Sequence, residues 1–139
     1  MYSKMMLALT LMLSGRAMTL AFIQRAGGDM PGDPPAAWLM PIMGDAVIGI
    51  SALWIAYLIV KKSGLWVWTT IIVWNSLAIW DALSAFVIHT TDPWPEFFMI
   101  KMMRPSMFFA ASAMHLLIII LACKADVRTR ILGLQNNSL

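Results

Sequence analysis

Four charged side chains interrupt apolar stretches of this chain. Asp45 lies within the run "MPIMGDAVIG", and Arg16, Asp81 and Arg104 each interrupt another apolar run. A charge near the centre of a bilayer costs about 2.5 to 3.5 kcal/mol by insertion measurements, so such residues normally face inward and pair. These four residues are therefore the first candidates for chemistry.

The four charges fall at similar depths. Asp45, Arg16 and Asp81 each lie about eight residues inside one end of their runs, or roughly 12 Å along a helix, and Arg104 lies about six residues inside its run. Two Arg and two Asp sum to zero. The coincidence predicts a charged layer that either clamps the helices together or forms a wet pocket for a proton, an ion or a small polar solute.

Other polar and small residues extend this pocket. Asp45 and Gly49 begin a stripe of small residues that allows a second helix to approach closely. His115 lies on the same helical face as Arg104 by i, i+4, i+7, i+11 spacing, and it is predicted to pack as a hydrogen-bonded residue. The predicted intramembrane pocket comprises Arg16, Asp45, Asn75, Asp81, Arg104 and His115.

The surrounding elements follow from composition. Of 139 residues, 60% are apolar and 12% are charged, and the charged share is about half that of a soluble domain. The predicted spans are 5–24, 37–60, 65–89 and 98–123, each long enough to cross a bilayer as a helix. Short connections predict one all-α domain over 1–139, an up-down-up-down four-helix transmembrane bundle. A cleaved signal is the alternative for the first span, but Arg16 interrupts its apolar stretch.

Charge asymmetry predicts the orientation. The helix ends and tail on one predicted side of the membrane carry the basic residues Lys4, Lys61, Lys62, Lys124, Arg128 and Arg130. The loops of the other side carry Asp29, Asp33, Asp92 and Glu96 against Arg25 alone. Because positive residues stay in the cytoplasm, both termini are predicted to be cytoplasmic, in a bacterial inner membrane. Trp38 and Trp94 are then predicted to mark the outer interface.

Several functional classes find little support in the sequence. The basic residues do not gather into a stripe, which argues against a nucleic-acid partner, and the single Cys123 excludes an internal disulfide. No HExxH, phosphate loop, GxSxG or Cys pair is present, so no catalytic residue and no metal site are assigned. His89 and His115 lie on the order of 25 Å apart along the bundle, too far for a shared haem. The sequence does not identify a cofactor.

Met99, Met103 and Met107 recur every four residues in "MIKMMRPSM". This spacing resembles the MxxxM motif of copper importers, and thioethers do select Cu(I). The importers differ in having three spans, a GxxxG after the motif and Met-rich outer tails. Copper handling is kept as a minor alternative.

A second resemblance covers more of the chain. The segments "PIMGDAVIGISA", "VWNSLAIWD" and "MHLL" resemble a loose group of small bacterial four-helix membrane proteins without an assigned activity. Their shared PxxGDxxxG and WNxxxxxD patterns and a late His imply that Asp45, Asn75, Asp81 and His115 are the positions of interest.

The sequence favours a non-enzymatic role. The leading hypothesis is a small membrane protein with an outward-facing charged pocket that acts by association with itself or with a larger membrane complex, because small-residue stripes suit helix docking. The alternative is an oligomeric transporter or channel that uses Asp45 and Asp81. Copper handling and a membrane enzyme acting on a lipid or quinone remain lesser alternatives.

Overall fold

The described part of the chain is a bundle of long helices. The computed structural model of the chain describes residues 2–94 and 105–134, and these residues form helices and turns without a strand. The helices are α1 (Tyr2–Leu13), the 3-10 helices η1 (Ser14–Arg25) and η2 (Ala36–Trp38), α2 (Leu39–Lys61), α3 (Leu65–Thr91), α4 (Pro105–Cys123) and α5 (Ala125–Leu132).

Four helical stretches are long and apolar enough to cross a membrane: Tyr2–Arg25, Ala36–Lys61, Leu65–Thr91 and Ser106–Cys123. They agree closely with the predicted spans, and they indicate an integral membrane protein. The predicted start of the fourth span lies outside the described residues. The order of the helices across a membrane and the side on which the termini lie stay predictions.

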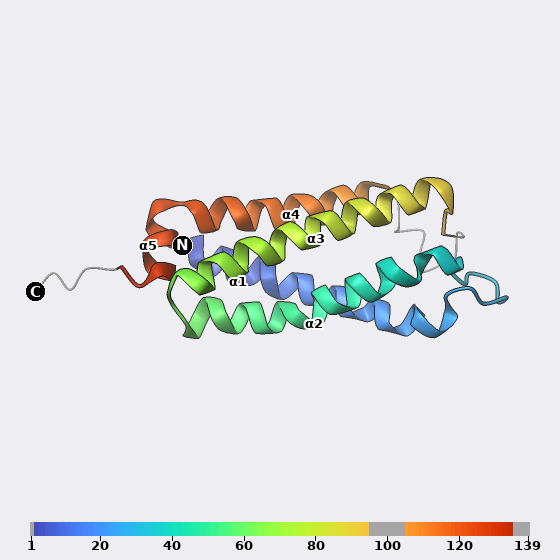
Figure 1. Cartoon of the computed structure of the whole chain (residues 1–139), viewed down its shortest axis with the longest axis horizontal. Helices are drawn as coiled ribbons and strands as arrows, with labels where there is room; N and C mark the ends of the chain where they lie inside the picture. Colours follow the sequence, from blue (N-terminus) through green and yellow to red (C-terminus); the bar gives the residue numbers. More distant parts are fainter. Residues whose placement is uncertain (1, 95–104, 135–139) are drawn as a thin grey trace, which may run out of the picture.

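The helices associate as two pairs. α2 packs chiefly against η1, and α3 packs chiefly against α4, while α1 contacts both α2 and α4. The start of α1 and α5 lie at one end of the bundle, and segment 26–35 and the end of α3 lie at the other (Figure 1). We call the half with the start of α1 and α5 the terminal half, and the half with η1, segment 26–35 and the end of α3 the loop half.

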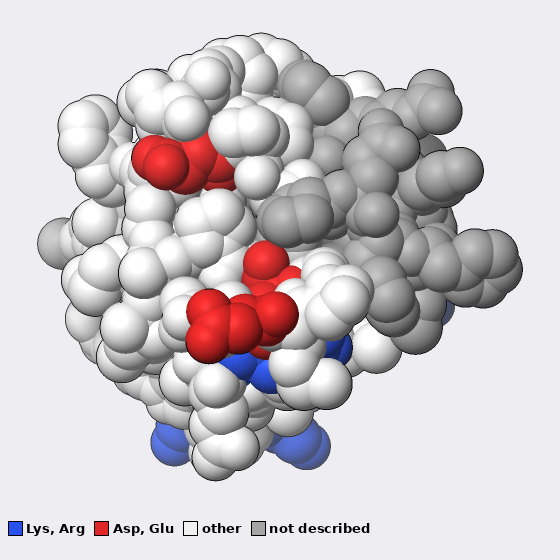
Figure 2. All heavy atoms as spheres, turned by 90° about the vertical axis from the view of Figure 1, so that its right-hand side faces the viewer, with Lys and Arg blue, Asp and Glu red and all other residues white. Residues whose placement is uncertain are grey.

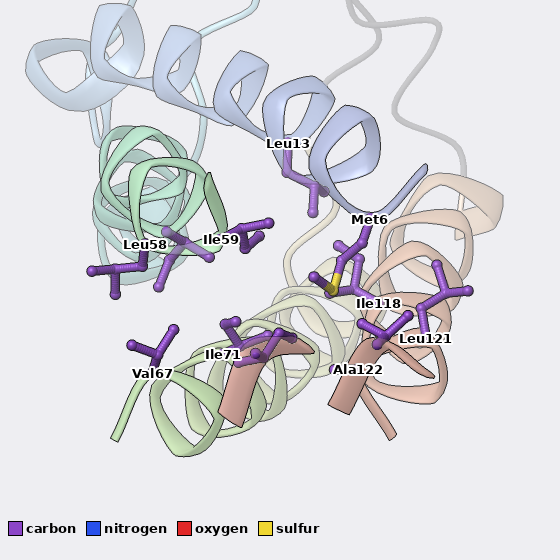
Figure 3. Close-up of a cluster of buried hydrophobic side chains, with 12 residues drawn as sticks. Met6, Leu13, Leu58, Ile59, Val67, Ile71, Ile118, Leu121 and Ala122 are labelled. Atoms are coloured by element: carbon purple, nitrogen blue, oxygen red, sulfur yellow. The ribbon is translucent and has the colours of Figure 1, made fainter. Parts of the chain in front are cut away.

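The terminal half has an apolar core. Its side chains come from α1, α2, α3, α4 and α5 and meet in the middle of the bundle (Figure 3). Since lipid tails are as apolar as these side chains, close packing rather than transfer from water holds this region together. The buried members of the cluster are Met6, Leu13, Ile55, Leu58, Ile59, Val67, Ile71, Ile118, Leu121, Ala122, Val127 and Ile131.

Helix α5 is absent from the predicted architecture. It places Val127 and Ile131, four residues apart, in the terminal-half core, and Gly133 ends it with a left-handed conformation at φ 74°. An i, i+4 apolar pair followed by a C-terminal glycine is a sequence signal for a short amphipathic helix. The tail was instead interpreted only as a basic segment.

The first span changes its helical form in the loop half. α1 gives way at Ser14 to η1, a 3-10 helix of 12 residues, although 3-10 runs are usually far shorter and often mark a hinge or strain. Ser14 Oγ donates to the Leu11 carbonyl at 2.7 Å, and Thr19 Oγ1 donates to the Arg16 carbonyl at 2.7 Å. Such local bonds, together with a Ser–Gly step, compete with regular α-helical bonding.

Aromatic rings close the loop end of the bundle. Trp38 and Trp94 are only 2% and 4% exposed, and their ring centroids lie 5.1 Å apart. The Trp38 indole N–H donates to the Asp92 carbonyl at 2.7 Å, and that of Trp94 donates to the Gly32 carbonyl at 3.3 Å. The two tryptophans were predicted to mark an interface, and the structure instead buries both in an aromatic cap that ties the loops to the helices.

The loop end carries acidic side chains on its surface. Figure 2 shows this end, with carboxylates gathered in two places on the face. Asp29 and Asp92 are exposed there, whereas Asp33 is buried and pairs with Arg25 at 2.6 Å. The charge difference between the two ends on which the orientation prediction depends is therefore present in the folded chain.

Candidate functional site in the loop half

Arg16 joins three other helices at one level of the bundle. Its Nε donates to Asp45 Oδ1 of α2 at 2.6 Å, and its Nη2 contacts the same oxygen. Nη2 also donates to Asp81 Oδ2 of α3 at 2.7 Å, and Nη1 lies 3.1 Å from His115 Nε2 of α4. One guanidinium thus links η1 to α2, α3 and α4.

The hydrogen bonds fix the state of His115. A guanidinium can only donate, so His115 Nε2 must accept, and the proton of the neutral ring lies on Nδ1. That nitrogen is 2.8 Å from Asn75 Oδ1, and Asn75 Nδ2 donates to the Ile71 carbonyl at 2.7 Å. The chain of polar contacts therefore runs from Arg16 through a neutral imidazole to Asn75 and ends on a backbone carbonyl.

Two glycines of α2 make room for the polar cluster. A Cβ on Gly49 would overlap Ala17 N and lie 2.7 Å from the Arg16 carbonyl carbon. A Cβ on Gly44 would overlap the Asp81 carboxylate, with Cγ at 2.9 Å. A larger side chain at Gly49 would thus push η1 away from α2, and one at Gly44 would displace the Asp81 carboxylate. The two glycines therefore let the η1 backbone and the Asp81 carboxylate lie against α2.

Beside the cluster lies a cavity of about 430 Å³, which is within the usual range for small-molecule sites. Its wall is apolar and aromatic except for Thr19, Arg16 and Asp45. The lining side chains come from α1, η1, η2, α2, α3 and α4, and Trp38, Trp94 and Phe108 line it on the side of the aromatic cap. The site is thus an apolar cavity with the Arg16–Asp45 ion pair in its wall.

The structure brings together five of the six predicted site residues: Arg16, Asp45, Asn75, Asp81 and His115. Arg104 lies outside the described residues, as do Met99 and Met103 of the copper motif. Asp81 pairs with Arg16, as Asp45 does. His115 is buried and lies within hydrogen-bonding distance of Arg16 and Asn75, and its role as a packing residue stays a prediction.

Sequence reasoning missed some contributors to the site. Gly44 precedes Asp45 in the sequence, but only the fold shows that the Asp81 carboxylate of α3 lies against it. Thr19 Oγ1 lies 3.2 Å from the Ile42 carbonyl and lines the cavity, and nothing in its sequence surroundings marks it. The aromatic wall could have been suspected from Trp38, which follows the segment "PGDPPAA", and from Trp94, which lies between two prolines in "DPWP".

Metal chemistry gains no support from the described residues, which contain no cluster of three His, Cys, Asp or Glu side chains that could hold an ion. His89 packs against Trp38, with ring centroids 6.0 Å apart, and His115 packs against Trp74 at 5.3 Å. The two histidines belong to different environments, the aromatic cap and the polar cluster. The cavity beside the polar cluster is large enough to hold an organic cofactor or ligand.

Comparison of the chain with known protein families, with curated proteins and with solved structures finds no match. The resemblance to small four-helix membrane proteins therefore stays an expectation. The candidate site is supported by its own geometry alone.

Proposed function

We propose that this protein binds a small amphipathic molecule from the membrane in the loop-half cavity, with the Arg16–Asp45 pair as the polar end of the site. The observation that carries the proposal is an apolar cavity of about 430 Å³ with a partly exposed ion pair in its wall. Ligand sites combine these two features: a mostly apolar lining for affinity and a few placed polar groups for orientation.

The charges of the cluster indicate the chemistry of the ligand head. Among the described residues of the cluster, Arg16 contributes one positive charge and Asp45 and Asp81 contribute two negative ones, a sum of −1 when all are ionised, while Arg104 lies outside the described residues. The Trp38 and Phe108 rings also line the cavity, and aromatic faces attract cations. A cationic or hydrogen-bond-donating head, above all an amine, fits this site better than an anionic one.

The cavity is placed for entry from the side. Gly15 of η1 and Met107 and Ala110 of α4 line it and are also exposed on the surface of the bundle. In the described chain η1 packs chiefly on α2 and α4 chiefly on α3. A molecule dissolved in the lipid can thus reach the ion pair between η1 and α4.

Conduction through a single copy finds less support. The polar contacts end at the Ile71 carbonyl, and Ile71 itself belongs to the apolar core of the terminal half. Thr10 is the other fully buried polar side chain of the described residues beside that core, and its hydroxyl donates to the Met6 carbonyl at 2.9 Å rather than to the cluster. Association with a second copy or a larger complex, and transport by an oligomer, stay predictions.

Three compounds with one alkyl chain and different heads test the proposal: decylamine, decanol and decanoate. Their effects on the melting temperature of the purified protein in detergent measure binding. We expect stabilisation in the order amine, alcohol, carboxylate, and Asp45→Asn should remove the preference for the amine because it removes one anionic partner of the ligand head. Asp92→Asn, an exposed carboxylate outside the cavity, serves as the control.

A second experiment fills the cavity without changing its charged residues. Ala111→Leu adds an apolar side chain at a lining position, and it should weaken all three compounds alike. Equal stabilisation of the wild type and Ala111→Leu by every compound would show that the cavity is not the binding site. A preference for decanoate would contradict the proposed head chemistry.

A further inference from the structure

A second cavity lies at the opposite end of the bundle. It measures about 230 Å³ and opens among the start of α1, the end of α2 and α5. Three cationic side chains line it, Lys61, Lys62 and Arg130, together with the hydroxyls of Ser3 and Ser63. The Gly64 N–H donates to the Ile131 carbonyl at 2.7 Å and fixes α5 beside the turn after α2. The fold thus brings together cations from positions about 70 residues apart in the chain.

The lining of this cavity has one sign of charge. No Asp or Glu lines it, and none of its three cations forms an ion pair with a described residue. Basic groups and hydroxyl donors around one space match the oxygens of a phosphate. The anion that would neutralise this group must therefore come from outside the described chain.

The surroundings indicate the source of the phosphate. Lys61 ends the second membrane-spanning helix, so the cavity lies at the level where lipid head groups are expected. Val60 lines the cavity and is 50% exposed, and it begins an exposed apolar stripe that continues along α2 through Tyr57 and Leu53. These residues recur at i, i−3 and i−7 on one face. An acyl chain attached to the phosphate can follow this stripe into the bilayer.

We propose that the cavity formed by Ser3, Lys61, Lys62, Ser63 and Arg130 binds the phosphate of an anionic phospholipid. It lies at the end of the bundle that charge asymmetry predicts to be cytoplasmic, where anionic lipids attract basic segments. The site would hold α5 and the 62–64 turn against a lipid head group. This proposal does not depend on the ligand of the loop-half cavity.

The test compares two double variants that remove the same charge. Lys62→Gln/Arg130→Gln removes two cations from the cavity, whereas Lys4→Gln/Arg128→Gln removes two exposed cations that do not line it. Each purified protein in neutral detergent is titrated with dioleoylphosphatidylglycerol, dioleoylphosphatidylcholine or sodium phosphate. Bound lipid is counted by native mass spectrometry, and the melting temperature is measured in parallel.

We expect phosphatidylglycerol to bind with saturation and to raise the melting temperature, with little effect of phosphatidylcholine. The cavity variant should bind phosphatidylglycerol about 30-fold more weakly, given about 1 kcal/mol per basic residue near a lipid surface, and the control variant should bind it nearly as well as the wild type. Equal losses in the two variants would show diffuse charge attraction and overturn the proposal. A saturable effect of sodium phosphate as large as that of the lipid would assign the cavity to free phosphate and overturn the lipid source.

Discussion

The two halves of the bundle differ in how their interiors are packed. The terminal half packs twelve buried apolar side chains from five helices around one centre, and its first span is a regular α-helix. The loop half contains an ion-pair cluster, a cavity of about 430 Å³ and a 3-10 helix. The terminal half is filled at its centre, with a smaller cavity of about 230 Å³ at its end, whereas the loop half is hollow beside its polar cluster.

This difference assigns separate tasks to regions of the same helices. Dense packing in the terminal half can hold the four spans together without help from the charges, because packing drives helix association in lipid. The loop half can then keep open space beside its polar cluster. The η1 segment, whose 3-10 form often marks hinges, lies on the hollow side and supplies both Arg16 and part of the cavity wall.

The strongest way to break this comparison is to remove the shared cation. Arg16→Met leaves Asp45 and Asp81 without the guanidinium that both contact. Removing one partner of a fully buried ion pair typically costs about 3 to 5 kcal/mol. Because the side chains of Arg16 and Asp45 are 13% and 28% exposed, we expect a somewhat smaller loss in the free energy of unfolding, of about 2 to 4 kcal/mol. Titration with dodecyl sulfate, followed by circular dichroism, measures it.

Arg128→Met, at an exposed position of α5, is the matched control and should change the free energy of unfolding little. Asp45→Asn/Asp81→Asn in the Arg16→Met background should recover part of the loss, because the unpaired charges are then gone. If Arg16→Met is as stable as Arg128→Met, the polar cluster does not hold the loop half together.

Much of this architecture was predictable from the sequence. The spans follow from the length of the apolar runs, and the charged layer follows from one ionisable residue per run at similar depth. What depth cannot give is the partner of each charge. Asp81 pairs with Arg16 at a level where Gly44 leaves room for the Asp81 carboxylate beside α2, and this depends on how the helices are rotated about their axes.

Other features could not be predicted because they depend on contacts between distant segments. Trp38 is buried because Trp94 and Phe108 cover it, whereas a lone tryptophan near a span end favours the interface. The cavity beside η1 depends on how whole helices fit together, since six helices line it. In contrast, α5 carries a local signal in Val127, Ile131 and Gly133.

The close approach of α2 to η1 at Gly49 offers a second test, with a smaller expected effect. Gly49→Ala places a methyl group against the backbone of η1, where no side-chain rotation can relieve the overlap. We expect a loss of about 1 to 3 kcal/mol, as for other overpacked positions, together with weaker coupling between Arg16 and Asp45 in a double-mutant cycle. Unfolding in dodecyl sulfate again provides the measurement.

Gly15→Ala is the control for this change on the opposing segment. A Cβ at Gly15 meets nothing within 4 Å, so the substitution should be neutral or stabilising by up to about 1 kcal/mol through reduced chain entropy. Equal effects at the two glycines would contradict close approach of α2 and η1.

The smallest effect is expected where the bundle is hollow, and two alanines of α4 sharpen the comparison there. Ala111 lines the loop-half cavity, and Ala122 is fully buried in the terminal-half core. Ala111→Leu should change the free energy of unfolding by less than about 0.5 kcal/mol because the added side chain has room, whereas Ala122→Leu should lose about 1 to 3 kcal/mol by overpacking. Both variants differ from the wild type by the same atoms on the same helix, so helix propensity and lipid contact largely cancel. A loss at Ala111 as large as that at Ala122 would mean that the loop half is filled in the membrane, and the cavity could then not receive a ligand without first expanding.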